Sequence, residues 1–244
     1  MLSAIESCQT NNMSLPGAPF VSFRTVAPYL SLAGGRETLI KTRPWKKTPR
    51  YKRNQLKRQG TLEFRRAESK EEMYEVLPVL TELHIQRRAD CGDESFLADD
   101  KGQRFVKQLI ERFAESGLLQ LHWLSLGEKI IALCMGFETQ QSYSYYVPTF
   151  DSEWSKFAPG SVLLSYLIED CINREIPTFD FGQGDESYKQ RFATSSGQLN
   201  ALHLFRRGIA ALQKGSLPLT DAVQIVVRTD QDLSVADGRA GVDQ

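Results

Sequence analysis

The sequence predicts an α/β (α+β) fold, with a mixed, mostly antiparallel sheet flanked by helices. Three observations support this class. Apolar residues repeat at helical spacing between Met73 and Leu83, whereas residues 61–67 alternate as in a strand. The apolar segments 118–126 and 129–138 are separated by a Gly-Glu turn and indicate a hairpin. The 244 residues suffice for one large domain, or for one domain with appendages.

The expected helices and strands follow a defined order from residue 61. After the strand at 61–67, Ser69 and Glu72 form a capping box for a helix that runs to about Arg88, with an expected kink at Pro78. A second helix, capped by Asp99 or Asp100, covers about 102–115. The remaining elements are strands at 118–126, 129–138 and 142–148, a helix after 160, a strand at 178–181, a short helix at 186–193 and a strand at 199–207.

This succession, with two helices after the first strand and a three-strand meander before the third helix, is that of the GNAT acyltransferase fold. In that fold the strands expected here at 143–147 and 178–181 are parallel neighbours that splay apart and open a slot for the acyl carrier. We therefore expect a GNAT-like domain at 60–216. Around it we expect an irregular N-terminal arm at 1–35, a basic connector at 36–59, and a tail at 217–244 that is disordered from about residue 229.

Charge and cysteine usage restrict the functional class. Thirty basic and thirty acidic residues give a net charge of +0, so no global attraction to nucleic acid or anionic membrane is expected. The segment 41–58 holds nine Lys or Arg and no acid. It could contact RNA, although a solvated amphipathic connector is the favoured interpretation. The four isolated cysteines indicate a reducing compartment without a disulfide or zinc framework.

The sequence shows no basic leader and no apolar run of membrane-spanning length, so a cytoplasmic protein without membrane insertion is expected. No Walker loop, paired metal ligands or Ser-His-Asp spacing is present, and no metal is expected. The oligomeric state cannot be read from the sequence.

Two stretches carry candidate chemistry. Pro159, Gly160 and Ser161 open a helix whose free N–H groups suit a phosphate. Taken alone, these residues are better explained as a simple helix start, but in this element order they fall where GNAT-like proteins bind the carrier's pyrophosphate, which favours the binding role. The second stretch, "FDFGQGDESYKQRF", puts two glycines and several polar residues after a buried strand. A structural salt bridge from Asp180 or Asp185, with Lys189 in solvent, is the competing interpretation.

The second stretch and the segment before it resemble the CelD-type acetyltransferase-like family. This family belongs to the GNAT superfamily and is related to the Fem-type aminoacyl transferases. The matching residues are Asp151, Trp154, Pro159, Gly160, Phe179, Asp180, Phe181, Gly184, Asp185, Tyr188 and Lys189; Ala158 replaces the family's usual Ser. "LHIQRR" also resembles a family stretch, matching His84 and Arg87 or Arg88. The resemblance covers about residues 27–206, and members usually have another GNAT-like half in front, of which 1–35 could be a remnant.

The resemblance implies acyl transfer from acyl-CoA to an amine or hydroxyl of a sugar or cell-envelope/exopolysaccharide precursor. Direct attack needs a deprotonated acceptor and a polarised carbonyl, so Asp180, Asp185 and Tyr188 are the expected proton-handling residues and Lys189 the charge stabiliser. We expect His84, Arg88 and Gly184 to bind substrate. The alternatives are Fem-like aminoacyl transfer from tRNA, or a non-catalytic GNAT fragment that acts as a binding module in polysaccharide synthesis.

Overall fold

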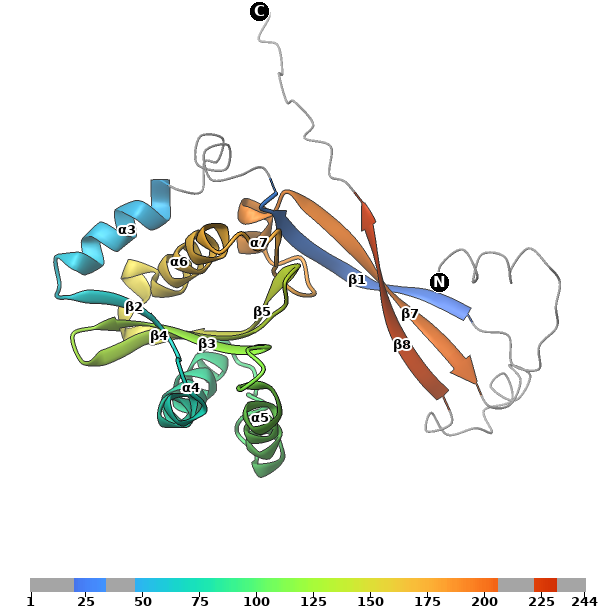
Figure 1. Ribbon diagram of the computed structural model, residues 1–244, viewed down its shortest axis with the longest axis horizontal. Coiled ribbons are helices and arrows are strands. Elements are labelled where there is room, and N and C mark those ends of the chain that lie inside the picture. Colours follow the sequence, from blue (N-terminus) through green and yellow to red (C-terminus); the bar gives the residue numbers. More distant parts are fainter. Residues whose placement is uncertain (1–19, 34–46, 206–221, 232–244) are drawn as a thin grey trace, which may run out of the picture. The chain divides into compact units, whose positions relative to one another are not determined.

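The computed structural model describes residues 20–33, 47–205 and 222–231, and the chain divides into two compact units (Figure 1). The larger unit comprises Pro28–Gly182 and Glu186–Ser195. Gln183–Asp185 and the described residues outside these ranges belong to the smaller unit. Strand β1 (Phe20–Ser31) contributes residues to both units.

The larger unit is built on a mixed sheet in which the strand order is β2-β3-β4-β5-β6-β1. All neighbouring pairs are antiparallel except β5 and β6, which are parallel. This sheet confirms the mixed, mostly antiparallel class expected from the sequence. Besides Pro28–Ser31 of β1, its strands are β2 (Leu62–Arg66), β3 (Leu119–Leu126), β4 (Lys129–Glu138), β5 (Ser142–Phe150) and β6 (Thr178–Asp180).

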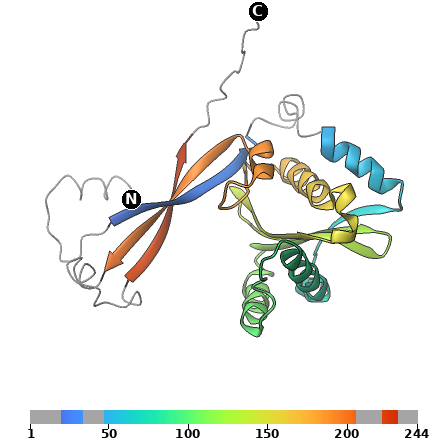
Figure 2. The ribbon, with the colours of Figure 1, turned by 180° about the vertical axis from the view of Figure 1, so that it is seen from behind.

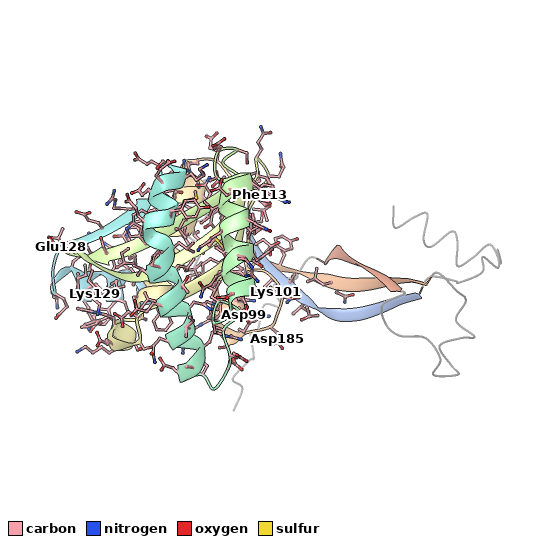
Figure 3. All side chains as sticks on the ribbon, turned by 90° about the horizontal axis from the view of Figure 1, so that it is seen from below. Asp99, Lys101, Phe113, Glu128, Lys129 and Asp185 are labelled. Atoms are coloured by element: carbon pink, nitrogen blue, oxygen red, sulfur yellow. The ribbon has the colours of Figure 1, made fainter. Side chains whose placement is uncertain are left out.

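Helices cover both faces of this sheet (Figures 1 and 2). Helices α4 (Lys70–Asp90) and α5 (Asp100–Phe113) lie side by side on one face (Figure 3), and α3 (Lys47–Lys57) and α6 (Pro159–Asn173) lie on the other. The expected caps are confirmed: Ser69 accepts a hydrogen bond from the Glu72 N–H, and Asp99 accepts one from the Gly102 N–H. Helix α4 continues through Pro78.

Two apolar clusters, one on each face, hold the larger unit together. Alternating strand residues supply both clusters, because successive side chains of a strand point to opposite faces. The α6 side contains, among others, Leu56, Cys134, Tyr143, Tyr145, Leu163, Leu167, Phe179 and Phe181. The α4/α5 side contains, among others, Met73, Leu80, Val106, Ile110, Trp123, Leu133, Met135 and Val147.

A β-bulge interrupts the pairing of β4 and β5. Met135 pairs with Val147 but Gly136 pairs with Tyr145, so Tyr146 is an extra residue on β5. Consistent with this, Tyr145 is buried on the α6 side and Val147 on the α4/α5 side, although residues two apart in a regular strand share a face.

In the smaller unit β1 neighbours β7 (Ser195–Phe205), which pairs antiparallel with β8 (Ala222–Gln231). Strand β8 was not expected from the sequence and ends at Gln231, close to the expected start of disorder at about residue 229; residues 232–244 lie outside the described part. The expected domain boundaries stay predictions. The segment expected as an arm contributes β1, and the one expected as a connector contributes α3.

Candidate functional site

The candidate site begins where the pairing of β5 and β6 ends. These strands pair in parallel at three positions, Ser142↔Thr178, Tyr143↔Phe179 and Ser144↔Asp180. Strand β6 then ends, whereas β5 continues to Phe150. The parallel arrangement expected for these two strands is therefore confirmed, whereas the separation expected between them stays a prediction. Beyond Ser144, the edge of β5 that faces away from β4 is no longer paired with β6.

Asp180 stands at the point where this pairing ends. Its neighbours Phe179 and Phe181 are 0% and 1% exposed and pack on the α6 side, so the Asp180 side chain points to the opposite face. An Asp180 carboxylate oxygen accepts a hydrogen bond of 2.8 Å from the Gly182 N–H. Gly182 and Gly184 have φ values of 74° and 108°, which explains why the turn after this strand requires glycines.

Lys189 lies in the short helix α7 (Ser187–Phe192) and is buried rather than solvated. Its ammonium lies 2.8 Å from a carboxylate oxygen of Glu186. Burial, the largest single contribution, would raise the pKa of Glu186, but the hydrogen bond from Lys189, a backbone hydrogen bond and the charge of Lys189 together lower the pKa. Glu186 was not singled out in the sequence, where only its spacing of three residues from Lys189 could have indicated the pair.

Tyr188 is half-buried against the α6-side core. Burial, with a smaller contribution from the negative charge of Glu186, raises the pKa of the Tyr188 hydroxyl. The hydroxyl therefore stays protonated at neutral pH and can donate a hydrogen bond or a proton.

Gly184 and Asp185 belong to the smaller unit, whereas Asp180, Tyr188 and Lys189 belong to the larger one. The Gly184 N–H donates to the Val26 carbonyl over 2.8 Å. Asp185 is exposed (Figure 3). Three of the five residues expected in this polar site therefore belong to one unit. That all five form a single site stays a prediction.

The N-terminus of α6 follows β5 after the short helix η2 (Ser152–Phe157). Ala158 adopts a left-handed conformation with φ 50°, and Pro159 occupies the first turn. The Ser161 N–H donates to the Ala158 carbonyl over 3.0 Å. Of the three residues expected to bind a phosphate, Pro159 has no N–H, and the N–H of Ser161 is already bonded to the Ala158 carbonyl. The N–H of Gly160 lies in the first turn of α6, where no earlier helical carbonyl can accept it, so it can bind a phosphate.

Gly160 packs directly on the ring of Phe150, at the end of β5. A Cβ atom added at Gly160 would lie 3.1 Å from Cδ1 of Phe150, which is tighter than most such contacts. Arg87, at the end of α4, holds its guanidinium carbon 4.8 Å from the centroid of the same ring. Arg87 and the first turn of α6 therefore contact one side chain.

The two α4 residues expected to bind substrate have local partners. His84 Nδ1 lies 2.7 Å from Ser95 Oγ, and burial, aided by the charge of Arg88, lowers the pKa of His84. Arg88 pairs with Asp93 over 3.4 Å. Arg87, not Arg88, contacts Phe150. The spacing Leu-His-x-x-Arg counted from Leu83 also ends at Arg87.

Asp151 and Trp154 hold the connection from β5 to α6. The buried Asp151 caps η2 by accepting the Glu153 N–H over 2.9 Å, and it lies 2.8 Å from the ammonium of Lys129, at the turn of the β3–β4 hairpin (Figure 3). Trp154 packs on Phe157 with ring centroids 5.6 Å apart. These motif residues fix the approach to α6 by structural contacts.

In the part of the chain that the structure describes, no group of three or more His, Cys, Asp or Glu side chains is arranged to hold a metal ion. None of the described helices combines the length and the apolar character needed to cross a membrane. Cys134 and Cys171 are free and buried, and burial raises the pKa of both thiols.

A family model described as "Acetyltransferase (GNAT) domain" matches residues 44–190. Since this span is more than half of the chain, the protein belongs to the GNAT acetyltransferase family, whose members transfer acetyl groups from acetyl-CoA. No curated protein sequence matches the chain.

Solved structures of low sequence identity share the fold. One is the C-terminal domain of a putative lysylphosphatidylglycerol synthetase from Agrobacterium fabrum, with 11% identity, TM-score 0.55, and 83% of this chain and 65% of that chain covered. L-PGS from Bacillus licheniformis has 12% identity, TM-score 0.53 and coverages of 81% and 65%. FemX has 10% identity, TM-score 0.52 and coverages of 70% and 59%. The chain thus spans less than two thirds of each of these structures.

Proposed function

We propose that this protein is a CelD-type GNAT acyltransferase that moves an acyl group from acyl-CoA to an amine or hydroxyl of a sugar or cell-envelope/exopolysaccharide precursor. The observation that carries the proposal is the parallel pair β5 and β6, whose pairing ends at Ser144 and Asp180 while β5 continues. Free, buried Cys134 and Cys171 support a reducing, cytoplasmic setting.

The donor would lie along β5. An extended chain can add to an unpaired strand edge through main-chain hydrogen bonds, and the pantetheine arm of CoA carries two amide groups that can do so. The edge of β5 beyond Ser144 leads toward Phe150 and on to the α6 N-terminus. There the Gly160 N–H and the helix dipole favour the pyrophosphate of the carrier.

The chemical step would be direct acyl transfer. The acceptor nitrogen or oxygen attacks the thioester carbonyl, the C–S bond breaks, and CoA leaves as a thiolate. Asp180 would accept the acceptor's proton. Tyr188, whose burial keeps its hydroxyl protonated, would give a proton to the leaving thiolate, and Lys189 would stabilise developing negative charge.

The basic segment favours this function over aminoacyl transfer from tRNA. On α3, Arg53 pairs with Glu169 over 2.7 Å and lies 4.0 Å from the Tyr166 ring centroid, and Lys52 donates to the Lys156 carbonyl over 2.6 Å. These cations pack α3 on α6 and η2. This supports a structural role for the described part of the basic segment, with RNA binding as the less favoured alternative.

Replacement of Gly160 tests the donor site. Gly160→Asp adds a carboxylate where the pyrophosphate would bind, so we expect acetyl-CoA affinity, measured by calorimetry, to fall at least tenfold. Gly160→Ala is the matched control, because it adds the same Cβ contact with Phe150 without the charge and should weaken binding less. Unchanged acetyl-CoA binding in a folded Gly160→Asp protein would contradict this site. Absence of binding in the wild type would favour the non-catalytic alternative.

A further inference from the structure

We infer that a partly exposed area on the α4/α5 side of the sheet, formed by Tyr29, Ser144, Tyr146 and Asp180, binds an acceptor that is an amino sugar. The inference rests on the proposed acyltransferase function and specifies the class of its acceptor. All four residues belong to the larger unit. We call them the acceptor face.

Strand pairing brings three of these residues into one row. Asp180 pairs with Tyr29 of β1 on one side and with Ser144 of β5 on the other. Paired residues of adjacent strands share a face of the sheet. The neighbouring residues Leu30 and Tyr143 are buried on the α6 side, in agreement with this alternation. The side chains of Tyr29, Asp180 and Ser144 therefore point to the α4/α5 side.

Tyr146 joins this row from the next position along β5. It lies two residues after Ser144 and so on the same face, before the bulge changes the alternation. Its ring packs on Phe137 of the α4/α5-side cluster with centroids 5.3 Å apart, yet the residue stays 47% exposed. An exposed aromatic ring supported by a second ring on a rigid strand offers a flat surface for a ligand.

The spacing suits a ligand the size of one sugar ring. Strands lie about 4.8 Å apart and rise about 3.3 Å per residue, which puts the Cα atoms of Tyr146 and Asp180 roughly 8 Å apart. Tyr29, Ser144 and Asp180 are only partly buried, so the face is accessible. A sugar ring stacked on Tyr146 would place a ring substituent near Asp180, where the pairing of β5 and β6 ends.

The acceptor face includes a carboxylate, that of Asp180, which suits a cationic ligand. This carboxylate lies among two tyrosines and a serine. A carboxylate binds an ammonium group strongly, and a tyrosine ring adds cation–π attraction. The same Asp180 that holds the ammonium is the group proposed to receive its proton, so binding also presents the amine for attack on the thioester.

The test measures sugar binding directly, without donor or turnover. The full chain is titrated with a chitosan disaccharide (two glucosamine units), with its N-acetylated counterpart, and with the linear diamine cadaverine, by ligand-observed saturation-transfer NMR. We expect the chitosan disaccharide to bind, and the neutral and linear probes to bind at least about tenfold more weakly. Tyr146→Ala should weaken disaccharide binding about tenfold, and Tyr146→Phe, which keeps the ring, clearly less.

Tyr51→Ala is the matched control, because Tyr51 is a 60% exposed tyrosine on α3, outside the acceptor face. It should bind the disaccharide as the wild type does. The inference is overturned if the disaccharide does not bind, if cadaverine binds equally well, or if Tyr146→Ala and Tyr51→Ala bind alike. These results do not depend on acetyl-CoA, so they are separate from failure of the proposed function, which the Gly160→Asp titration detects.

Discussion

Lys189 keeps only 4% of its surface exposed, which is uncommon for a lysine without a paired charge. Its ion pair with Glu186 accounts for part of this burial. The carboxylate itself is on an exposed residue, so the pair is partly screened by solvent and contributes little to stability. That the buried ammonium beside Tyr188 in α7 binds developing negative charge stays a prediction, which a substitution can test.

Substitution of Lys189 separates that role from packing. We expect Lys189→Met, which keeps the apolar stem, and Lys189→Ala both to fold and to lose about 100-fold or more in acyl-transfer rate, because a preorganised charge that stabilises a transition state has about this effect. The rate is measured as CoA thiol released with an amino-sugar acceptor, and folding by circular dichroism. A folded variant with the wild-type rate would show that Lys189 is structural.

His122 gives the larger unit a pH-dependent stability. Its side chain is fully buried, Nδ1 lies 3.2 Å from the Tyr143 hydroxyl, and Nε2 has no partner among the described residues. Burial, reinforced by the positive charges of Arg174 and Arg66, lowers the pKa of His122 to about 3. The unfolded chain binds a proton on His122 below about pH 6.5, whereas the folded protein does not do so until about pH 3.

The free energy of unfolding should therefore fall as the pH drops through this window, by up to about 1.4 kcal/mol per pH unit from His122 alone. Between pH 7 and pH 5 the wild type should lose about 2 kcal/mol more than His122→Gln, which has no titrating ring. Urea denaturation at both pH values measures the difference. The pKa of His84 is also lowered, but His84 is present in both proteins and cancels. Equal losses would mean that His122 is not held neutral.

At the scale of helices and strands, the features set by neighbours in sequence were predictable. The caps Ser69 and Asp99, the β3–β4 hairpin and the order of the elements from β2 to β7 follow from local periodicity and turn residues. Features that depend on distant segments were not. The bulge at Tyr146 exists only in the pairing of β5 with β4, and β8 is a strand because β7 pairs with it.

The same distinction applies to the candidate site. The glycines and Asp180 could be predicted because a turn after a buried strand is a local signal. Arg88 was expected to bind substrate, although the spacing from Leu83 fits Arg87; the packing of α4 on Phe150 shows that Arg87 is the one that contacts the end of β5. Lys129 was missed as the partner of Asp151, since the two residues are brought together by the pairing of β4 with β5.

At the scale of the whole chain, residues far apart in sequence complete the larger unit. Pro28–Ser31 lies in the segment expected as an irregular arm, yet Leu30 pairs with Phe179 and is fully buried in the α6-side core. The Thr194 N–H also donates to the Tyr29 carbonyl over 2.9 Å. These contacts join residues near 30, 180 and 194, so folding of the sheet requires segments that the sequence assigned to different parts.

Truncation of Leu30 tests this integration. We expect Leu30→Ala to lower the free energy of unfolding by about 2–5 kcal/mol, because a buried leucine that becomes alanine loses its transfer free energy and leaves a cavity. Ser31→Ala is the matched control: Ser31 is exposed, its N–H bond to Thr194 Oγ1 is unaffected, and the change should be within about 0.5 kcal/mol. Urea denaturation measures both. Near-identical stabilities of the two variants would show that the segment around Leu30 is an arm on the surface, and the acceptor face, which takes Tyr29 from the same strand, would then lose one of its tyrosines.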